Sequence, residues 1–72
     1  MIRNDTYKVN GRTLAYGTEF TAKRLGRVRF IGHVISDTSE WLDCVDKKLM
    51  VRSCSVDEVK RVHRTQKIGR RR

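Results

Sequence analysis

Lysine and arginine side chains are the groups in this sequence whose number and spacing indicate a definite chemistry, the binding of phosphate groups. Among 72 residues there are 17 Lys and Arg but only 8 Asp and Glu, which gives a formal net charge of +9. Arg27 and Arg29 are separated by one residue in the stretch GRVRFIGHVI, so both project from one face of an extended strand. Contacts of such side chains with phosphates release counterions and favour the binding of a polyanion. We therefore interpret this face as a nucleic-acid-binding surface, with a merely solvated strand face as the simpler alternative.

The positive charge falls into two separate segments. Residues 1–36 carry seven basic and two acidic side chains, and residues 59–72 carry seven basic and no acidic ones. Residues 37–58 between them carry three basic and six acidic side chains. A continuous phosphate-binding surface therefore requires the fold to bring the two basic segments together. The residues that we expect to bind nucleic acid are Lys23, Arg24, Arg27, Arg29, Lys60, Arg61, Arg64, Lys67, Arg70, Arg71 and Arg72.

Residue types used in catalysis and metal binding are few and scattered. His33 and His63 are the only histidines, and neither has a neighbouring partner of a known catalytic motif. Cys44 and Cys54 do not form a CxxC pair or another zinc-ligand spacing, and the hairpin register given below does not place them opposite each other. We expect no enzymatic activity, no metal, no cofactor and no disulfide.

The start of the chain, MIRND, is polar and shows no hydrophobic region of an export signal. No apolar run approaches the length that spans a membrane. Two isolated cysteines without an export signal indicate a reducing compartment. We expect a cytoplasmic protein that does not bind membranes.

Turn signals in the first half of the chain predict short strands. The dipeptide Asn10-Gly11 is a strong hairpin signal, and a two-residue turn there places Val9 opposite Arg12. A short strand follows around Phe20, and the alternation in GRVRFIGHVI predicts a half-buried strand with a bulge or a sharp bend at Gly32. The apolar face of the first hairpin would consist of Tyr7, Val9, Leu14 and Tyr16.

The stretch WLDCVDKKLMVRSC predicts a second hairpin. A turn at Lys47-Lys48 places Asp43 opposite Arg52 as an exposed pair of opposite charges, although Lys-Lys is a poor turn pair and a longer loop would also fit. Trp41 lies on the outer side with Asp43, where we expect it to pack under a neighbouring segment, with stacking on a base or anchoring a protein partner as the alternatives. The inner face would consist of Leu42, Cys44, Leu49 and Val51.

The last segment, SVDEVKRVHRTQK, allows two structures. Ser55 and Glu58 form a capping box, which starts a helix. The β-branched valines that follow favour a single helical turn and then a strand over residues 60–64. The alternative is an α+β fold with a C-terminal helix over residues 56–68.

The order of a long bent strand (RVRFIGHVI), a hairpin (EWLDCVD and LMVRSC), one helical turn (SVDEV) and a last strand (KRVHR) resembles an SH3-like small β-barrel of the KOW and Tudor type. The resemblance covers residues 18–64. It implies an all-β barrel of about five strands, to which the N-terminal hairpin is an addition. We expect residues 1–66 to form this single domain and residues 67–72 to be a basic disordered tail. The chain also resembles small uncharacterised proteins of bacteriophages that infect actinobacteria, which implies the host cytoplasm as its location.

SH3-like barrels serve nucleic-acid binding, protein binding and structural roles, so the charge has to decide between them. We expect a small basic protein that binds DNA or RNA through backbone charge and largely independently of sequence. The alternative is a protein–protein interaction module that docks on and modulates a host protein, or that self-associates through acidic and basic faces. In either case we expect a monomer or a weak homo-oligomer.

Overall fold

The computed structural model describes residues 1–63, which form eight strands and one turn of 3-10 helix. Five of the predicted binding residues (Arg64, Lys67, Arg70, Arg71 and Arg72) and the predicted tail lie outside the described residues. The all-β fold class is confirmed. The elements are β1 (Ile2–Asn4), β2 (Thr6–Val9), β3 (Arg12–Ala15), β4 (Glu19–Ala22), β5 (Gly26–Ile35), β6 (Glu40–Val45), β7 (Val51–Ser55), η1 (Val56–Glu58) and β8 (Val59–Val62).

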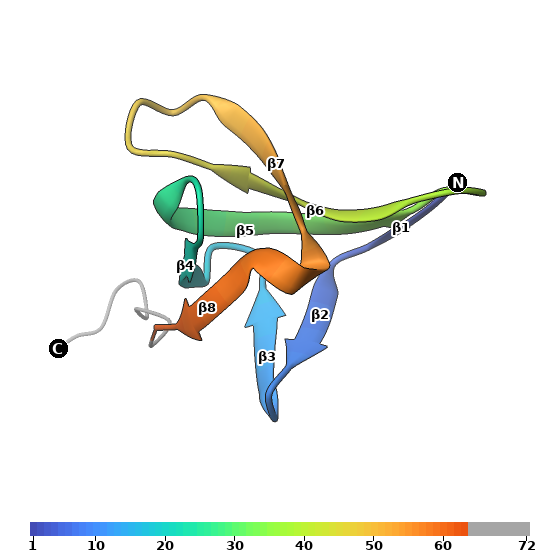
Figure 1. Ribbon diagram of the computed structural model, residues 1–72, viewed down its shortest axis with the longest axis horizontal. Coiled ribbons are helices and arrows are strands. Elements are labelled where there is room, and N and C mark those ends of the chain that lie inside the picture. Colours follow the sequence, from blue (N-terminus) through green and yellow to red (C-terminus); the bar gives the residue numbers. More distant parts are fainter. Residues whose placement is uncertain (64–72) are drawn as a thin grey trace, which may run out of the picture.

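Strand β5 organises the sheet (Figure 1). Its first part pairs with β4, its last part pairs with β1, and its other edge pairs with β6. The strand order is β7-β6-β5-β4-β8, and β2 and β3 form a separate hairpin. Over residues 1–63 this path ends at β7 and β8 and the sheet does not close, so the SH3-like barrel stays a prediction. Of the two predictions for Gly32 the bulge is confirmed, because the register with β6 shifts between Phe30 and Gly32.

The core is built from alternate residues of the sheet strands. Phe20 points inward from β4, whereas its neighbours Glu19 and Thr21 are only partly buried. In the same way Val28 is buried in β5 between two exposed arginines. The side-chain period of two in a strand therefore directs the core and the charged groups to opposite faces. The main core cluster consists of Leu14, Phe20, Ala22, Val28, Phe30, Leu42, Cys44 and Cys54.

The first hairpin has the predicted register, with Val9 opposite Arg12 and a turn of positive φ at Asn10 and Gly11. The prediction that Tyr16 joins its apolar face is wrong, because Tyr16 is 76% exposed. The chain turns immediately after β3, where the amide of Thr18 donates to the carbonyl of Ala15. Tyr16 therefore lies in a turn and not in the continued strand.

The predicted register of the second hairpin is wrong by one residue. Asp43 opposes Ser53, and Cys44 opposes Arg52. The turn is not Lys47-Lys48 but a loop over residues 46–50, because Oδ1 of Asp46 accepts hydrogen bonds from the amides of Lys48 (2.9 Å) and Met50 (3.0 Å). A shift of one residue moves every side chain of a strand to the other face.

This shift decides which residues enter the core. Leu49 and Val51 are exposed, whereas Cys54 is buried in their place. Cys44 and Cys54 are free thiols, and hydrogen bonding with Cys54 together with burial raises the pKa of Cys44.

Asp43 is held by three donors on the outer side of the sheet. Its carboxylate accepts from Arg3 Nη1 (2.7 Å), from Trp41 Nε1 (3.0 Å) and from Ser53 Oγ (3.2 Å). The predicted pair with Arg52 is therefore wrong, since Arg52 bonds instead to Asp46 (3.3 Å). Trp41 is half-buried on the predicted side. The hydrogen bond from its Nε1 to Asp43 holds the indole against the sheet, and the N–H group of a buried tryptophan usually has such a partner.

The last segment forms the predicted helical turn and strand, and the alternative helix over residues 56–68 is wrong over the part of it that the structure describes. Ser55 caps η1, and the amide of Ser55 donates to the carboxylate of Glu58 in return. Strand β8 then pairs with β4. The backbone of β8 therefore bonds to a neighbouring strand and not within a helix. The β-branched valines of β8 favour this extended conformation.

The cap of η1 predicts acid sensitivity. A hydrogen bond from Arg24, and then one from the Ser55 amide, lower the pKa of Glu58 from 4.5 to about 2. A carboxyl group whose pKa falls on folding contributes stability above its unfolded pKa and loses it as the pH falls through the folded value. We expect the melting temperature, followed by circular dichroism, to fall between pH 4.5 and pH 2. The fall should be smaller in Glu58→Gln than in the control Asp57→Asn, and an equal fall in both would contradict this assignment.

Candidate nucleic-acid interface

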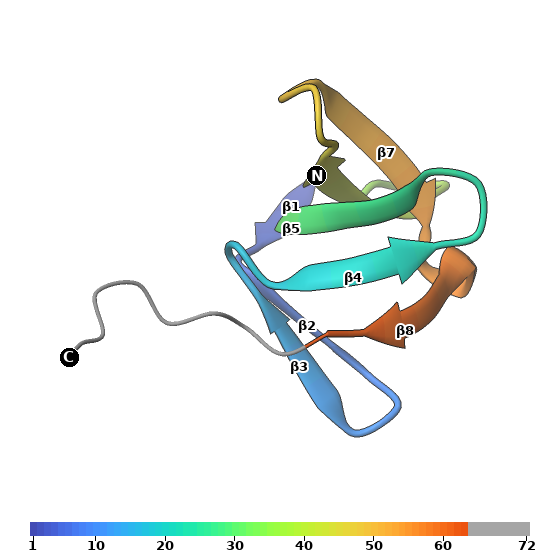
Figure 2. The same cartoon turned by 90° about the vertical axis from the view of Figure 1, so that its left-hand side faces the viewer.

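Strand β4 lies between β5 and β8 and brings the two basic segments of the chain together (Figure 2). Thr21 is opposite Arg27 of β5 on one side and opposite Arg61 of β8 on the other. Residues directly opposite in antiparallel strands project from the same face, with Cβ atoms about 4.5–5.5 Å apart. Arg27 and Arg61 therefore flank Thr21 on the outer face, although 33 intervening residues separate them in the sequence.

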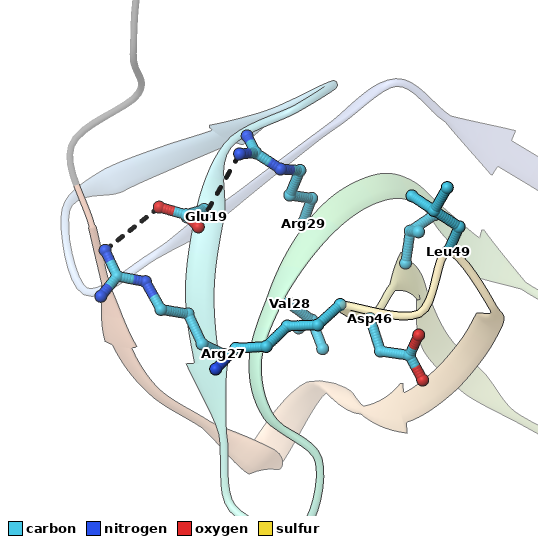
Figure 3. Close-up of a pocket in the computed structure, with 8 residues that line it drawn as sticks. Glu19, Arg27, Val28, Arg29, Asp46 and Leu49 are labelled. Carbon is cyan, nitrogen blue, oxygen red and sulfur yellow. Dashed lines mark hydrogen bonds and ion pairs between the residues drawn. The ribbon is translucent and has the colours of Figure 1, made fainter.

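A second row on this face contains the acidic residue Glu19. Glu19 is opposite Arg29, and its carboxylate lies 3.1 Å from a guanidinium nitrogen of Arg27 and 3.9 Å from one of Arg29 (Figure 3). His63 follows β8, and its Nε2 lies 2.8 Å from the hydroxyl of Thr21. Glu19 offsets part of the positive charge, but it also holds both guanidinium groups at the same place. Each arginine side chain remains about half exposed, at 51% and 53%, so donors are left for a ligand.

The other predicted residues of the described chain contribute less to this face. Arg24 is paired with Glu58 through two hydrogen bonds, one of them 3.0 Å long, so its charge is largely offset. Lys23 and Lys60 are exposed. Lys60 lies where the register between β4 and β8 shifts, next to the row that contains Arg61.

A basic groove that the sequence analysis missed lies beside this face. It runs between the β4–β5 turn and the loop of residues 46–50 and has a volume of about 350 Å³. An adjoining hollow of about 250 Å³ reaches Glu19 and Arg29, and it is shown in Figure 3. Asp46 is the one acidic residue that lines the groove among the described residues. The basic residues that line it are Arg27, Lys47, Lys48 and Arg52.

Asp46 fixes the conformation of the loop that forms one side of this groove. Hydrogen bonds from the amides of Met50 and Lys48 and from Arg52 lower its pKa, so it stays a carboxylate. Its two oxygens are used to shape the loop and to fix one arginine, and the loop in turn places Lys47 and Lys48 at the groove. Lys47, Lys48 and Arg52 belong to residues 37–58, the segment with an excess of acidic side chains. The charge distribution along the sequence therefore did not point to them. The poor match of Lys-Lys to a two-residue turn was the one signal of a longer loop.

The histidines are engaged in structural contacts. His33 is buried, with Nε2 2.6 Å from the carboxylate of Glu40 and Nδ1 3.2 Å from the side-chain nitrogen of Asn4. The ring of Tyr7 packs against it with centroids 4.5 Å apart. Residues 1–63 contain no group of three or more His, Cys, Asp or Glu side chains arranged to hold a metal ion. They also contain no apolar helix long enough to cross a lipid bilayer.

Comparison with known proteins gives one family. The whole chain, residues 1–72, matches the family model described as "Domain of unknown function (DUF7246)". No curated protein and no solved structure matches the chain. The SH3-like resemblance and the resemblance to phage proteins are not tested by this match and stay predictions.

Proposed function

We propose that this chain, which belongs to the DUF7246 family of domains of unknown function, binds DNA or RNA through the phosphate backbone. The observation that carries the proposal is the position of Thr21 between Arg27 and Arg61, next to the basic groove. Among residues 1–63 the acidic side chains that line these surfaces are Glu19, which lies between Arg27 and Arg29, and Asp46, which pairs with Arg52. The basic residues that face the same ligand are Arg27, Arg29, Lys47, Lys48, Arg52 and Arg61.

The mode of binding follows from the kind of contact available. Arginine and lysine bind phosphates without regard to base sequence, and such contacts position a protein on the nucleic acid. The one helical element of residues 1–63 is the three-residue η1, which is too short to read bases from a groove. The protein therefore binds largely independently of sequence, with an affinity that falls steeply with salt. If about four phosphates are contacted, the slope of log K against log salt is about −3.6 on duplex DNA.

The test is a salt titration of binding to a labelled duplex by fluorescence polarisation, comparing the wild type with the double variant Arg27→Ala, Arg61→Ala. We expect the slope to fall by about two in this variant, because each lost phosphate contact removes about one. The control Lys8→Ala, Arg12→Ala removes the same charge from the exposed β2–β3 hairpin and should change the slope by less than about one. Absence of binding at low salt would overturn the proposal, and equal losses in both variants would overturn the assignment of the binding surface to Arg27 and Arg61.

The protein-docking alternative receives less support from the charges. It relies on a free acidic face in the middle segment, but four of the six acidic residues there are engaged within the chain. Their partners are Arg3 for Asp43, Arg52 for Asp46, Arg24 for Glu58 and His33 for Glu40. A pull-down from a nuclease-treated lysate separates the two functions, since a partner held through nucleic acid is lost on treatment.

A further inference from the structure

The tip of the β6–β7 hairpin exposes three consecutive apolar side chains. Leu49 is 83% exposed, Met50 58% and Val51 65%. The hairpin projects from the sheet beside the β4–β5 turn (Figure 1). Exposed apolar residues gathered in this way mark interaction sites, whereas single ones are ordinary. We call Leu49, Met50 and Val51 the apolar tip.

The apolar tip is held in its exposed position. The amide of Leu49 donates to the carbonyl of Asp46 (3.0 Å), and the amide of Met50 donates to the carboxylate of the same residue (3.0 Å). Leu49 has φ of 64°, a left-handed conformation that is unfavourable for leucine. Unfavourable backbone conformations persist where the surroundings impose them, and they are concentrated at functional sites.

The basic residues around the apolar tip identify the kind of partner. Lys47 and Lys48 precede it, Arg52 follows it, and all three line the basic groove. Leu49 itself lines the adjoining hollow, so a phosphate backbone held in the groove would pass beside the tip. Aliphatic side chains flanked by lysine and arginine act as wedges between the base pairs of duplex DNA, whereas single strands are bound by stacking on aromatic rings.

We propose that Leu49 and Met50 insert between adjacent base pairs of a DNA duplex from its minor groove, while the basic groove holds the phosphates, so that binding kinks the duplex. This inference rests on the proposed function and adds to it the choice of duplex DNA. A flat anionic membrane fits the geometry less well. The three cations that flank the tip in the sequence line a hollow between two loops, which suits a rod-like ligand.

The test measures bending and binding separately on one 30-base-pair duplex. Energy transfer between dyes at its two ends reports the kink, and polarisation reports the affinity. Wild-type protein should shorten the end-to-end distance as expected for a kink of about 20–90°. The variants Met50→Ser and Leu49→Ser, Met50→Ser should keep the salt slope but lose the bend. The control Ile2→Ser, which alters an exposed apolar residue of β1, should bend DNA as the wild type does.

The outcomes distinguish the two proposals. Binding by the wild type without a bend overturns the wedge and leaves the proposed function standing. Absence of binding at low salt overturns both. A bend that survives in the double tip variant overturns the wedge. Sedimentation with phosphatidylserine vesicles tests the membrane, and a tip variant that keeps the bend but loses vesicle binding also overturns the wedge. Melting curves of all variants check that the exposed substitutions leave the fold intact.

Discussion

Replacing Phe20 with alanine is expected to remove a large part of the free energy of unfolding. Phe20 is fully buried at the centre of β4, where it is opposite Val28 of β5 and Val62 of β8. Truncating a buried phenylalanine costs about 3–5 kcal/mol, from lost burial and from the cavity that remains. A domain of this size has a free energy of unfolding of only about 4–11 kcal/mol. Urea unfolding followed by Trp41 fluorescence measures the difference.

Tyr16→Ala is the matched control for this prediction. Tyr16 is an aromatic residue of similar size that lies four positions earlier, but it is 76% exposed. Its replacement should change the free energy of unfolding by less than about 0.5 kcal/mol, as is usual for surface positions. If Phe20→Ala cost no more than Tyr16→Ala, the packing of β4 between β5 and β8 would be wrong, and with it the alignment of Arg27 and Arg61.

The double variant Lys47→Glu, Lys48→Glu is expected to have the largest effect on binding. It replaces two cations of the basic groove with anions at exposed positions, so the fold should be retained. Loss of two phosphate contacts alone lowers the affinity about a hundredfold at about 0.1 M salt, because each contact contributes about 0.9 to the slope of log K. The new carboxylates add repulsion to this loss. Polarisation titrations at fixed salt measure the effect.

The control for this prediction changes the net charge by the same amount elsewhere. Lys8→Glu, Arg12→Glu alters exposed residues of β2 and β3, which do not line the groove. If binding depends on the groove, the loop variant should lose much more affinity than the hairpin variant. Equal losses would show that net charge alone attracts the nucleic acid, and the groove would then have no particular role.

Local patterns predicted much of the fold. Alternation of polar and apolar residues in β5 identified Arg27 and Arg29 as outward-facing, and the Asn-Gly turn set the register of the first hairpin. Gly32 marked the bulge of β5, and the capping box of Ser55 marked η1. These predictions were correct because each depends on interactions within a few residues, whose geometry any fold must respect.

The second hairpin was mispredicted because a side chain competes with the backbone. Asp46 accepts the amides of two loop residues and so lengthens the turn, and such side-chain bonding to local backbone is not visible in an alternation pattern. The one-residue shift that results buried Cys54, exposed the apolar tip and moved Arg52 from Asp43 to Asp46.

The amino-acid sequence by itself determined an all-β chain with a large excess of positive charge and with two arginines on the outer face of one strand. Tertiary structure alone decided which distant charges act together. Pairing of β4 with both β5 and β8 places Arg27 and Arg61 on either side of Thr21. The loop of residues 46–50 places Lys47 and Lys48 at the groove that Arg27 also lines. The physical reason is that side-chain alternation is a property of one strand, whereas a charged surface is made by neighbouring strands and loops, whose register depends on long-range hydrogen bonds and core packing.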